Sequence, residues 1–377
     1  MLTHKGTNKA AASILIMLFL AGLLFGGILI FVVSYRQVTI LNSQISNLQS
    51  DVSNLEGHQN ATYQTITILQ NGTSLADLYA NVQNSVVLVQ GDTSDGGVQG
   101  SGFVYNFDDQ NVVLTNYHVV QDTTGLSVTF SDGNGYSATV LGTDPYSDLA
   151  VLSVKDAPAS EFKPFTIVGS AQLRVGEPVI AIGNPYGLVG SLTTGVVSAT
   201  GRTITEDSAG NYAIANIIQT STPINPGNSG GPLLNSVGNV VGITAAIVSD
   251  SQGLGFAIPS NTILREVSAL ITTGSYHGHS YLGILEEDMS YSVAQKVGSN
   301  ITYGCKIQSI TSGGPSEGHL KVNDIIVALN NQKIKNNDDL ASYLEENTLP
   351  GDLLDLTVIR GNQTINVSLT LGTRPAP

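Results

Sequence analysis

The stretch NPGNSGGPL (225–233) sets a serine, Ser229, in a glycine-rich turn that leads into an apolar strand. Glycine tolerates backbone conformations that other residues rarely adopt, so such a turn can present backbone N–H groups at unusual angles. A serine in this setting is usually only a turn former. Whether Ser229 has a chemical role therefore depends on what the rest of the chain offers it.

Two upstream segments supply groups that can activate a serine hydroxyl. In TNYHVV (115–120), His118 stands just past an apolar strand, and in DPYSDLAVL (144–152), Asp148 directly precedes one. A neutral imidazole can take the serine proton, and a buried carboxylate can hold that imidazole in the correct tautomer. Each residue alone is more often structural. Together, in the chain order of the chymotrypsin arrangement, His118, Asp148 and Ser229 predict a catalytic triad for acyl transfer.

The glycines around the serine predict an oxyanion hole. In acyl transfer the carbonyl oxygen becomes an anion, and backbone N–H groups must converge on it. Gly227 can turn its N–H toward that point because it lacks a Cβ. We assign the oxyanion hole to Gly227, Asn228 and Ser229, with the amides of Gly227 and Ser229 as the donors.

The region from about residue 75 to residue 271 has the pattern of strands and turns. Short apolar segments, such as 85–90, 111–116, 149–154 and 239–248, alternate with turns rich in Gly, Asn, Asp and Pro. Many short strands separated by turns are typical of an all-β sandwich or barrel, and about 200 residues suit a pair of small barrels. We therefore predict a mainly β, double-barrel domain at 75–271.

The composition limits the possible functions. The chain has 377 residues, of which 41% are hydrophobic and 12% charged, so two or three globular domains are expected. Its formal net charge of −14 would be repelled by phosphate backbones, so we expect no nucleic acid as a partner. The single cysteine, Cys305, allows neither an intrachain disulfide nor a cysteine-based zinc site, and we expect it to be buried. We expect no cofactor.

The N-terminal segment predicts a single-pass membrane anchor. Residues 13–33 form an uncharged apolar run that matches the hydrocarbon core of a bilayer, which takes about 20 residues. A cleavable signal peptide is the alternative, but its apolar region is usually shorter, about 7–15 residues, and ends in a cleavage site of small residues that this run lacks. Lys5 and Lys9 precede the run and Arg36 follows it. The N-terminus, 1–12, is therefore expected in the cytoplasm and the rest of the chain outside it.

A short helical stalk is predicted at 34–74. Apolar residues recur there at spacings of 4, 3, 4 and 3, the pattern of a coiled-coil seam, at Leu41, Ile45, Leu48, Val52 and Leu55. The run spans only about two heptads, which is marginal for a helix without other support. The alternative is a solvated helical spacer that does not associate.

A linker at 272–280 separates the barrels from a C-terminal module. It lacks periodicity and contains His277 and His279. Two histidines could suggest a metal site, but no further ligands cluster near them in the sequence. We therefore expect both histidines to be solvated and no metal to be bound.

Residues 281–373 resemble a PDZ domain, an α+β fold. Strands alternate with two short helical stretches, of which 338–344 is expected to lie beside a peptide groove. In such a domain a peptide C-terminus adds as a strand to a sheet edge, and backbone N–H groups hold its carboxylate. The carboxylate-binding loop is expected at Tyr281, Leu282, Gly283 and Ile284. The alternative is a module that only docks on the barrels as a support.

From about residue 75 to its end, the chain resembles the HtrA/Deg family of serine proteases. The segments that carry this likeness are TNYHVV (115–120), DPYSDLAVL (144–152), GNP (183–185), TSTPINPGNSGGPLLN (220–235) and GFAIPSN (255–261). The resemblance implies a trypsin-like, chymotrypsin-type double β-barrel followed by one or two PDZ domains. It also implies a homotrimer, ATP-independent cleavage and a role in protein quality control. It gives His118, Asp148 and Ser229 the roles of the triad.

The resemblance also bears on which peptide bond is cut. In proteases of this fold that cut after basic residues, an acid lies six positions before the serine, and here that position is Pro223. The pocket is therefore expected to take small or medium aliphatic residues such as Val, Ala, Leu or Ile. Its walls are expected at Ile224, Ile243, Thr244, Ala245 and Ala246. Residues 201–215 are expected to form a mostly polar loop beside the site.

The predicted function is that of an ATP-independent serine endopeptidase. It would cleave misfolded or regulatory proteins outside the cytoplasm, while the PDZ-like module binds unfolded chains or peptide C-termini. The rival prediction is a chaperone that holds unfolded chains without cutting them.

Overall fold

The structure, a computed structural model, covers most of the chain from residue 74 onward and some positions before it. The described residues are 17, 18, 20, 22, 35–46, 74–94, 96–184, 190–206, 212–245 and 254–376. The chain divides into two compact units, residues 1–68 and 69–377.

In the N-terminal unit, residues 35–46 are helical. Leu41 and Ile45 are both exposed on this helix, at 59% and 47%. The other three positions of the predicted seam, and nearly all of the predicted span 13–33, lie outside the described residues. Within the part of the chain that is described, no helix combines the length and the apolar character needed to cross a membrane. The anchor and the coiled coil stay predictions.

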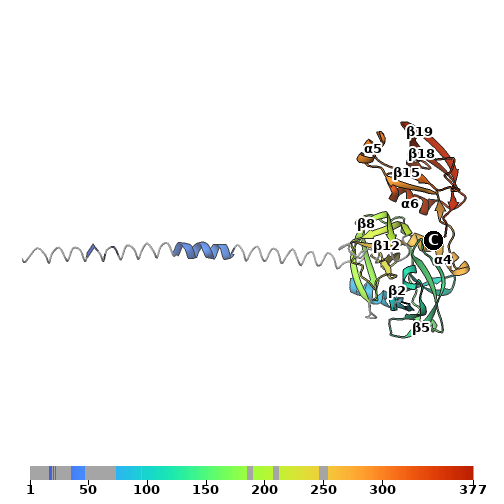
Figure 1. Cartoon of the computed structure of the whole chain (residues 1–377). Helices are drawn as coiled ribbons and strands as arrows, with labels where there is room; N and C mark the ends of the chain where they lie inside the picture. Colours follow the sequence, from blue (N-terminus) through green and yellow to red (C-terminus); the bar gives the residue numbers. More distant parts are fainter. Residues whose placement is uncertain are drawn as a thin grey trace, which may run out of the picture. The chain divides into compact units, whose positions relative to one another are not determined.

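The first barrel follows a short helix, α2 (Leu75–Val82), whose N-cap Ser74 accepts a hydrogen bond from the amide of Asp77. Six antiparallel strands close into a barrel in the order β1-β2-β3-β6-β5-β4 (Figure 1). Their bounds are β1 (Val86–Thr93), β2 (Gly96–Phe107), β3 (Gln110–Thr115), β4 (Thr124–Thr129), β5 (Gly135–Asp144) and β6 (Leu149–Val154).

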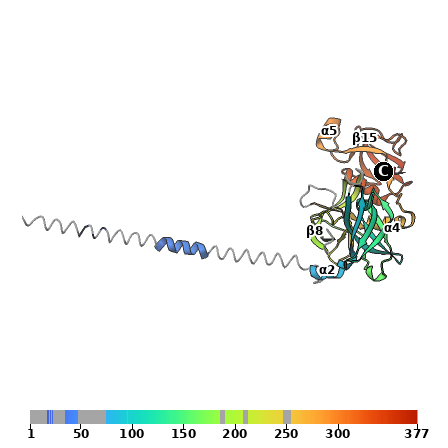
Figure 2. The same ribbon diagram turned by 60° about the horizontal axis from the view of Figure 1, so that its bottom comes forward.

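A second closed barrel has the strand order β10-β11-β12-β9-β8-β7. Its strands are β7 (Pro178–Gly183), β8 (Ser191–Glu206), β9 (Tyr212–Thr220), β10 (Pro232–Leu234), β11 (Val240–Ala245) and β12 (Gly255–Pro259). The helix α4 (Ser260–Thr273) follows at once and packs on β5 and β11 (Figure 2). Two residues that the sequence assigned to the linker thus belong to α4.

One apolar core is shared by the two barrels. Phe103 and Leu114 from the first barrel cluster with Ile182 and Ile258 from the second, and all four are at most 1% exposed. Burial of this much apolar surface favours a fixed pairing of the barrels. The predicted mainly β, double-barrel architecture is confirmed.

The prediction of a polar loop at 201–215 was wrong for most of that range. β8 extends to Glu206 and β9 begins at Tyr212, with Ile204 paired to Ile214. Ile214 is 2% exposed, and Ile204 packs against the same core. Isoleucines that alternate with polar residues are typical of a half-buried hairpin, in which only one face is polar.

The C-terminal domain is a small α+β fold. Its strands are β13 (Ser280–Tyr281), β14 (Ile284–Asp288), β15 (Cys305–Ile310), β16 (Ile325–Leu329), β17 (Gln332–Lys333), β18 (Leu353–Arg360), β19 (Gln363–Thr370) and β20 (Gly372–Thr373), and its helices are α5 (Tyr291–Val297) and α6 (Asn337–Asn347). The main sheet has the order β14-β15-β16-β18-β19, and β17 pairs with β16.

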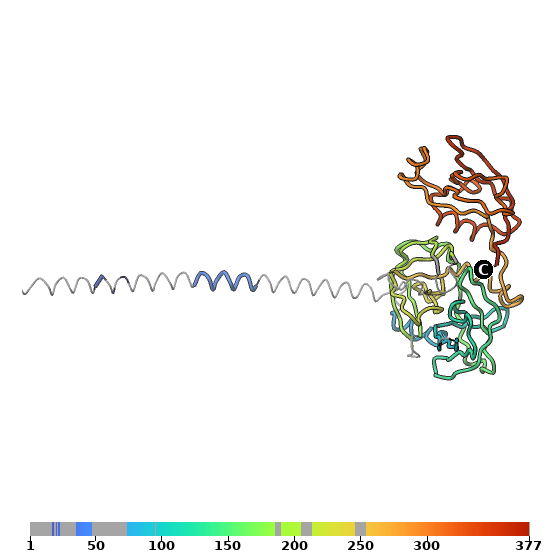
Figure 3. The backbone as a smooth tube through the Cα atoms, viewed as in Figure 1, coloured from blue at the N-terminus to red at the C-terminus, as the bar shows by residue number. Residues whose placement is uncertain are grey.

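The core of this domain contains Cys305, which is 0% exposed, as predicted. The chain end can be followed in Figure 3, where it returns toward the start of the domain. The Arg374 amide donates a hydrogen bond of 2.9 Å to the His279 carbonyl.

Candidate active site

Strand pairing brings His118 and Asp148 together. β3 pairs with β6 so that Thr115 lies opposite Ala150, which places the residues just beyond each strand end side by side. His118 lies in the single turn α3 (Tyr117–Val120). The distance from its Nδ1 to Asp148 Oδ2 is 2.8 Å, and its backbone N–H donates to Asp148 Oδ1 at 2.9 Å. The structure thus places these two predicted residues in direct contact.

The backbone of Asp148 is held in an unusual conformation. Its φ angle is +50°, a left-handed value that is uncommon for residues other than glycine. The Asp148 carbonyl accepts hydrogen bonds from Asn116 Nδ2 at 3.0 Å and from the Tyr117 amide at 3.1 Å. Asp148 is 0% exposed, so its carboxylate is shielded from water while it faces the imidazole.

Ser229 lies in a turn of the second barrel that contacts the first barrel. Its carbonyl accepts a hydrogen bond of 2.7 Å from the Ser101 amide in β2. The next residue, Gly230, has a φ of +84°, and a Cβ there would lie 2.3 Å from Thr115 Oγ1. Thr115 precedes His118 by three residues. The three predicted triad residues therefore come from three elements that meet at one junction.

The turn before Ser229 contains Gly227, the residue predicted to supply an oxyanion donor, in a left-handed backbone conformation. Gly227 has a φ of +95°. Its carbonyl accepts a hydrogen bond of 2.6 Å from Ser101 Oγ, which in turn accepts one of 2.7 Å from the Asn184 amide. The Asn228 amide is used within the turn, because it donates to the Asn225 carbonyl at 2.9 Å. Sequence reasoning missed Ser101, whose only signal was its place in the GSG stretch at 100–102.

The residues predicted to wall the specificity pocket differ in exposure. Ile224 is half-buried, whereas Ile243, Thr244 and Ala245 are at most 1% exposed, and Ala246 lies outside the described residues. Ile243 belongs to the shared core. The Thr244 hydroxyl donates to the Asn228 carbonyl at 2.6 Å. Thr244 therefore supports the serine turn, a role that the sequence did not suggest.

A groove of about 200 Å³ lies between residues 280–284 and the helix α6. Leu282, in the predicted carboxylate-binding loop, is 3% exposed, and Gly283 has a φ of +74°. The groove is also lined by Thr203, Ala213 and Ala215 of the β8–β9 hairpin.

The helix α6 is hydrogen-bonded to the second barrel. Asp338 accepts hydrogen bonds from Arg202 at 3.1 Å and from the Thr203 amide at 2.8 Å. Asn216 donates to Glu346 at 2.7 Å. The hairpin that adds barrel residues to the groove is thus hydrogen-bonded to α6, which also lines the groove.

The prediction that both linker histidines are solvated was wrong for His279, which is 4% exposed. Its Nε2 lies 2.6 Å from Asp144 Oδ2, and its Nδ1 lies 3.1 Å from Glu345 Oε2. Burial opposes protonation, but the hydrogen bonds to the two carboxylates outweigh it and raise the pKa of His279 to about 10. His277 forms a contact of 3.0 Å with Ser275.

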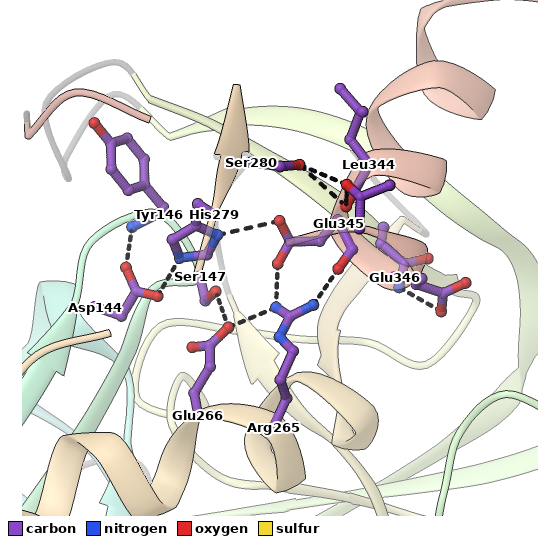
Figure 4. Close-up of polar contacts among 12 residues, drawn as sticks. Asp144, Tyr146, Ser147, Arg265, Glu266, His279, Ser280, Leu344, Glu345 and Glu346 are labelled. Carbon is purple, nitrogen blue, oxygen red and sulfur yellow. Dashed lines mark hydrogen bonds and ion pairs between the residues drawn. The ribbon is translucent and has the colours of Figure 1, made fainter. Parts of the chain in front are cut away.

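Two further charged residues, Arg265 and Glu266, lie beside these groups (Figure 4). Together with Asp144, His279 and Glu345 they form a buried set of charged side chains that we call the junction cluster. The Arg265 guanidinium donates a hydrogen bond of 2.6 Å to Glu266 Oε1, and it also donates hydrogen bonds to Glu345. Burial, and next the charge of Asp144, hold the pKa of Glu266 well above its ordinary value. Burial works against ionisation of Glu345, but His279 and Arg265 lower the pKa of its carboxyl group to about 2. Sequence reasoning missed the cluster because its members are far apart in the chain.

Two family models match the chain. Residues 100–243 match the trypsin-like peptidase domain, and residues 280–371 match the PDZ domain. The first range contains the three predicted triad residues, and the second contains residues 280–284 and the helix α6, which line the groove.

Curated relatives cover the same part of the chain. A probable periplasmic serine endoprotease, DegP-like, of Chlamydia trachomatis is 37% identical over 279 residues, which is 73% of this chain and 54% of the relative. The chloroplastic Protease Do-like 1 of Arabidopsis thaliana is 37% identical over 292 residues, 74% of this chain and 64% of the relative. The chain thus spans only between half and two thirds of the length of these relatives.

Solved structures match over nearly their whole length. The HtrA-type protease AlgW with tripeptide has a TM-score of 0.66 and 30% identity, covering 81% of this chain and 99% of that one. The serine endoprotease from Yersinia pestis has a TM-score of 0.59 and 29% identity, covering 80% and 99%. One assignment follows from the two barrels, the contact of His118 with Asp148 beside the Ser229 turn, the PDZ domain that follows and these relatives. The chain belongs to the HtrA family of serine proteases.

Proposed function

We propose that this protein is a serine endopeptidase. Ser229 attacks the peptide carbonyl, His118 takes the hydroxyl proton, and Asp148 stabilises the imidazolium that forms. His118 then returns the proton to the leaving amine, and water releases the acid from the acyl-enzyme. The observation that carries the proposal is the 2.8 Å contact between His118 Nδ1 and Asp148, next to the Ser229 turn.

The oxyanion is proposed to be held by the amides of Gly227 and Ser229. Support comes from the left-handed backbone of Gly227 and from the hydrogen bond that fixes its carbonyl on Ser101 Oγ. A donor group that is fixed before the reaction stabilises developing charge without having to reorganise.

Small or medium aliphatic residues are proposed to precede the cut bond. Pro223, at the position where an acid would select Lys or Arg, has no charge, and its carbonyl accepts a hydrogen bond from Thr193 at 2.9 Å. Ile224 is half-buried next to Gly255 of β12, which supports an apolar wall.

Peptide C-termini or unfolded chains are proposed to bind in the groove along β14 and α6 by strand addition. The solved AlgW structures hold a tripeptide or a decapeptide, which supports peptide binding by a similar chain. The substrates are proposed to be misfolded or regulatory proteins, cut without ATP.

A place outside the cytoplasm is proposed for the barrels and the PDZ domain. The apolar run 13–33 would be the anchor, and the seam that begins at Leu41 would help three copies to assemble. The DegP-like relative of Chlamydia trachomatis is named periplasmic, which supports this location.

The test is digestion of casein and of a quenched-fluorescence peptide mixture by the full chain and by Ser229→Ala. We expect the wild type to cut and Ser229→Ala to show no activity above background. Ser236→Ala, in the next turn of the same barrel, is the matched control and is expected to cut like the wild type. Equal cutting by Ser229→Ala would refute the proposal. A wild type that suppresses aggregation but cuts neither substrate would favour the chaperone alternative.

A further inference from the structure

Two Asn-x-Ser/Thr motifs lie close together in the last long hairpin of the C-terminal domain, outside the proposed active site. The first runs from Asn362 to Thr364 and the second from Asn366 to Ser368, and neither has a proline at its middle position. This motif is the acceptor for N-glycosylation, which attaches a bulky polar glycan at a surface position. The motif also arises by chance, so its meaning depends on whether the folded chain exposes these four side chains.

All four motif residues are exposed on the β18–β19 hairpin (Figure 1). Thr364, Asn366 and Ser368 follow one another at every second position of β19, and Asn362 directly precedes this strand. Successive side chains of a strand point to opposite faces of a sheet, so residues two positions apart share a face. Leu369, on the other face, is 2% exposed and belongs to the core of the domain. The motifs therefore occupy the solvent face of this strand.

The local geometry suits the attachment of a glycan to the side-chain nitrogen, Nδ2, of both asparagines. Asn362 follows Gly361 in the two-residue turn of the hairpin, where a φ of +62° at Gly361 lets the chain reverse. Asn362 thus lies at the tip of the hairpin. Asn366 contacts the neighbouring strand through its oxygen, because Oδ1 accepts a hydrogen bond of 3.3 Å from Thr357 Oγ1. This contact does not use the nitrogen that would carry the glycan.

The strand β19 lies at the opposite edge of the main sheet from the proposed peptide groove. The sheet begins with β14, whose first residue lines the groove, and ends with β19. Among the strand pairings of the described residues, β19 pairs with β18 alone. A free edge strand of eight residues can pair with another chain and so promote aggregation. Bulky polar groups on β19 would hinder such pairing and would leave the groove open.

We propose that Asn362 and Asn366 are N-glycosylated and that the two glycans cover the free edge of the sheet. The donor is an oligosaccharide linked to a lipid diphosphate. A bond forms between Nδ2 and the anomeric carbon of the first sugar, the bond from that carbon to the diphosphate oxygen breaks, and the amide gives up one proton as the lipid diphosphate leaves. The modification rests on the proposed location of this domain outside the cytoplasm, because N-glycosylation is a modification of secreted chains.

The test is peptide mass spectrometry of the full chain, extracted with detergent from the cells that produce it naturally. Cleavage with trypsin after Arg360 releases residues 361–377 with both motifs, since Arg374 is followed by a proline. We expect this peptide to carry two oligosaccharides, which fragmentation assigns to the two asparagines. The matched control is Asn331, an exposed turn residue of the same domain that lacks a Ser or Thr two positions later and is expected to be unmodified.

Three variants separate the two motifs. Thr364→Val is expected to lose the first glycan only, Ser368→Ala the second only, and Thr364→Ser, which keeps the motif, neither. The double variant, Thr364→Val with Ser368→Ala, is expected to lose both glycans and to aggregate at a lower temperature than the wild type, as measured by light scattering. Circular dichroism and casein cleavage before heating, both expected to match the wild type, check that each variant is folded.

Digestion by a protease added to intact cells shows on which side of the membrane the domain lies. An unmodified 361–377 peptide from a domain that is digested would overturn the glycosylation proposal and leave the proposed location standing. An unmodified peptide from a domain that the membrane protects would overturn both. Glycans that persist in the double variant would show that these motifs are not the acceptors. Equal aggregation of the wild type and the double variant would refute the covering of the sheet edge.

Discussion

The Asp148 carboxylate receives two hydrogen bonds from a single residue, His118: one from its ring Nδ1 at 2.8 Å and one from its backbone N–H at 2.9 Å. Because one buried carboxylate fixes both the ring and the backbone, the imidazole cannot turn without breaking contact with its partner. Nδ1 is occupied by Asp148, which leaves Nε2 as the atom for the serine proton.

Replacement of this carboxylate by an amide is expected to abolish most of the activity. In Asp148→Asn the amide nitrogen can donate to Nδ1, so the wrong tautomer is favoured, and kcat is expected to fall by about 10⁴-fold. Peptide cleavage at pH 7 measures this. Asp156→Asn is the control, because Asp156 also has a left-handed backbone, with φ +59°, but is exposed. An Asp148→Asn enzyme with wild-type kcat would contradict the assignment of the triad.

Loss of the Ser101 hydroxyl is expected to disturb the proposed oxyanion hole. Ser101 Oγ links the Gly227 carbonyl to the Asn184 amide, at 2.6 and 2.7 Å. We expect Ser101→Ala to lower kcat by about 10-fold with a smaller change in KM, because the effect falls on charge that develops in the transition state. Ser127→Ala, on β4, controls for a hydroxyl lost elsewhere in the first barrel. A change in KM alone would assign Ser101 to substrate binding instead.

The residue that precedes the cut bond is expected to be aliphatic. In a peptide library, kcat/KM for Val, Ala, Leu or Ile at this position should exceed that for Lys or Arg by about 100-fold, since no carboxylate at Pro223 compensates a buried cation. Mass spectrometry of casein digests gives an independent count of cleavage sites. Preferential cleavage after Lys or Arg would show that the pocket contains an acid from another segment.

Cys305 is expected to report on unfolding of the PDZ domain. Burial, and next the charge of Glu286, raise the pKa of its thiol, so less thiolate is present at any given pH. Labelling with a thiol reagent at pH 8 should be slow in the native protein and fast in urea. Cys305→Ala, which removes the only cysteine, should show no labelling in either state. Native labelling as fast as that in urea would place the thiol at the surface.

Much of the candidate site could be predicted because its chemistry depends on short local segments. TNYHVV, DPYSDLAVL and NPGNSGGPL each place one functional residue next to a strand end or a turn, and a double barrel brings such ends together. Supporting residues were missed where their role comes from a contact with a distant part of the chain. Ser101 contacts Gly227 across 126 positions, and Thr244 supports the serine turn from the opposite strand.

The sequence by itself determined which residues are candidates for the proposed triad, where the turn glycines lie and that a PDZ-like module follows a β domain, because periodicity and turn chemistry act within a few residues. Only the tertiary structure decided that 201–215 is largely a hairpin and that His279 is buried. The residues near His279 in the sequence do not indicate its contacts with Asp144, Glu266 or Glu345, because these three lie between 13 and 135 positions away. Burial and charge pairing depend on neighbours in space, and the neighbours of this histidine are assembled only when β5, α4 and α6 pack around it.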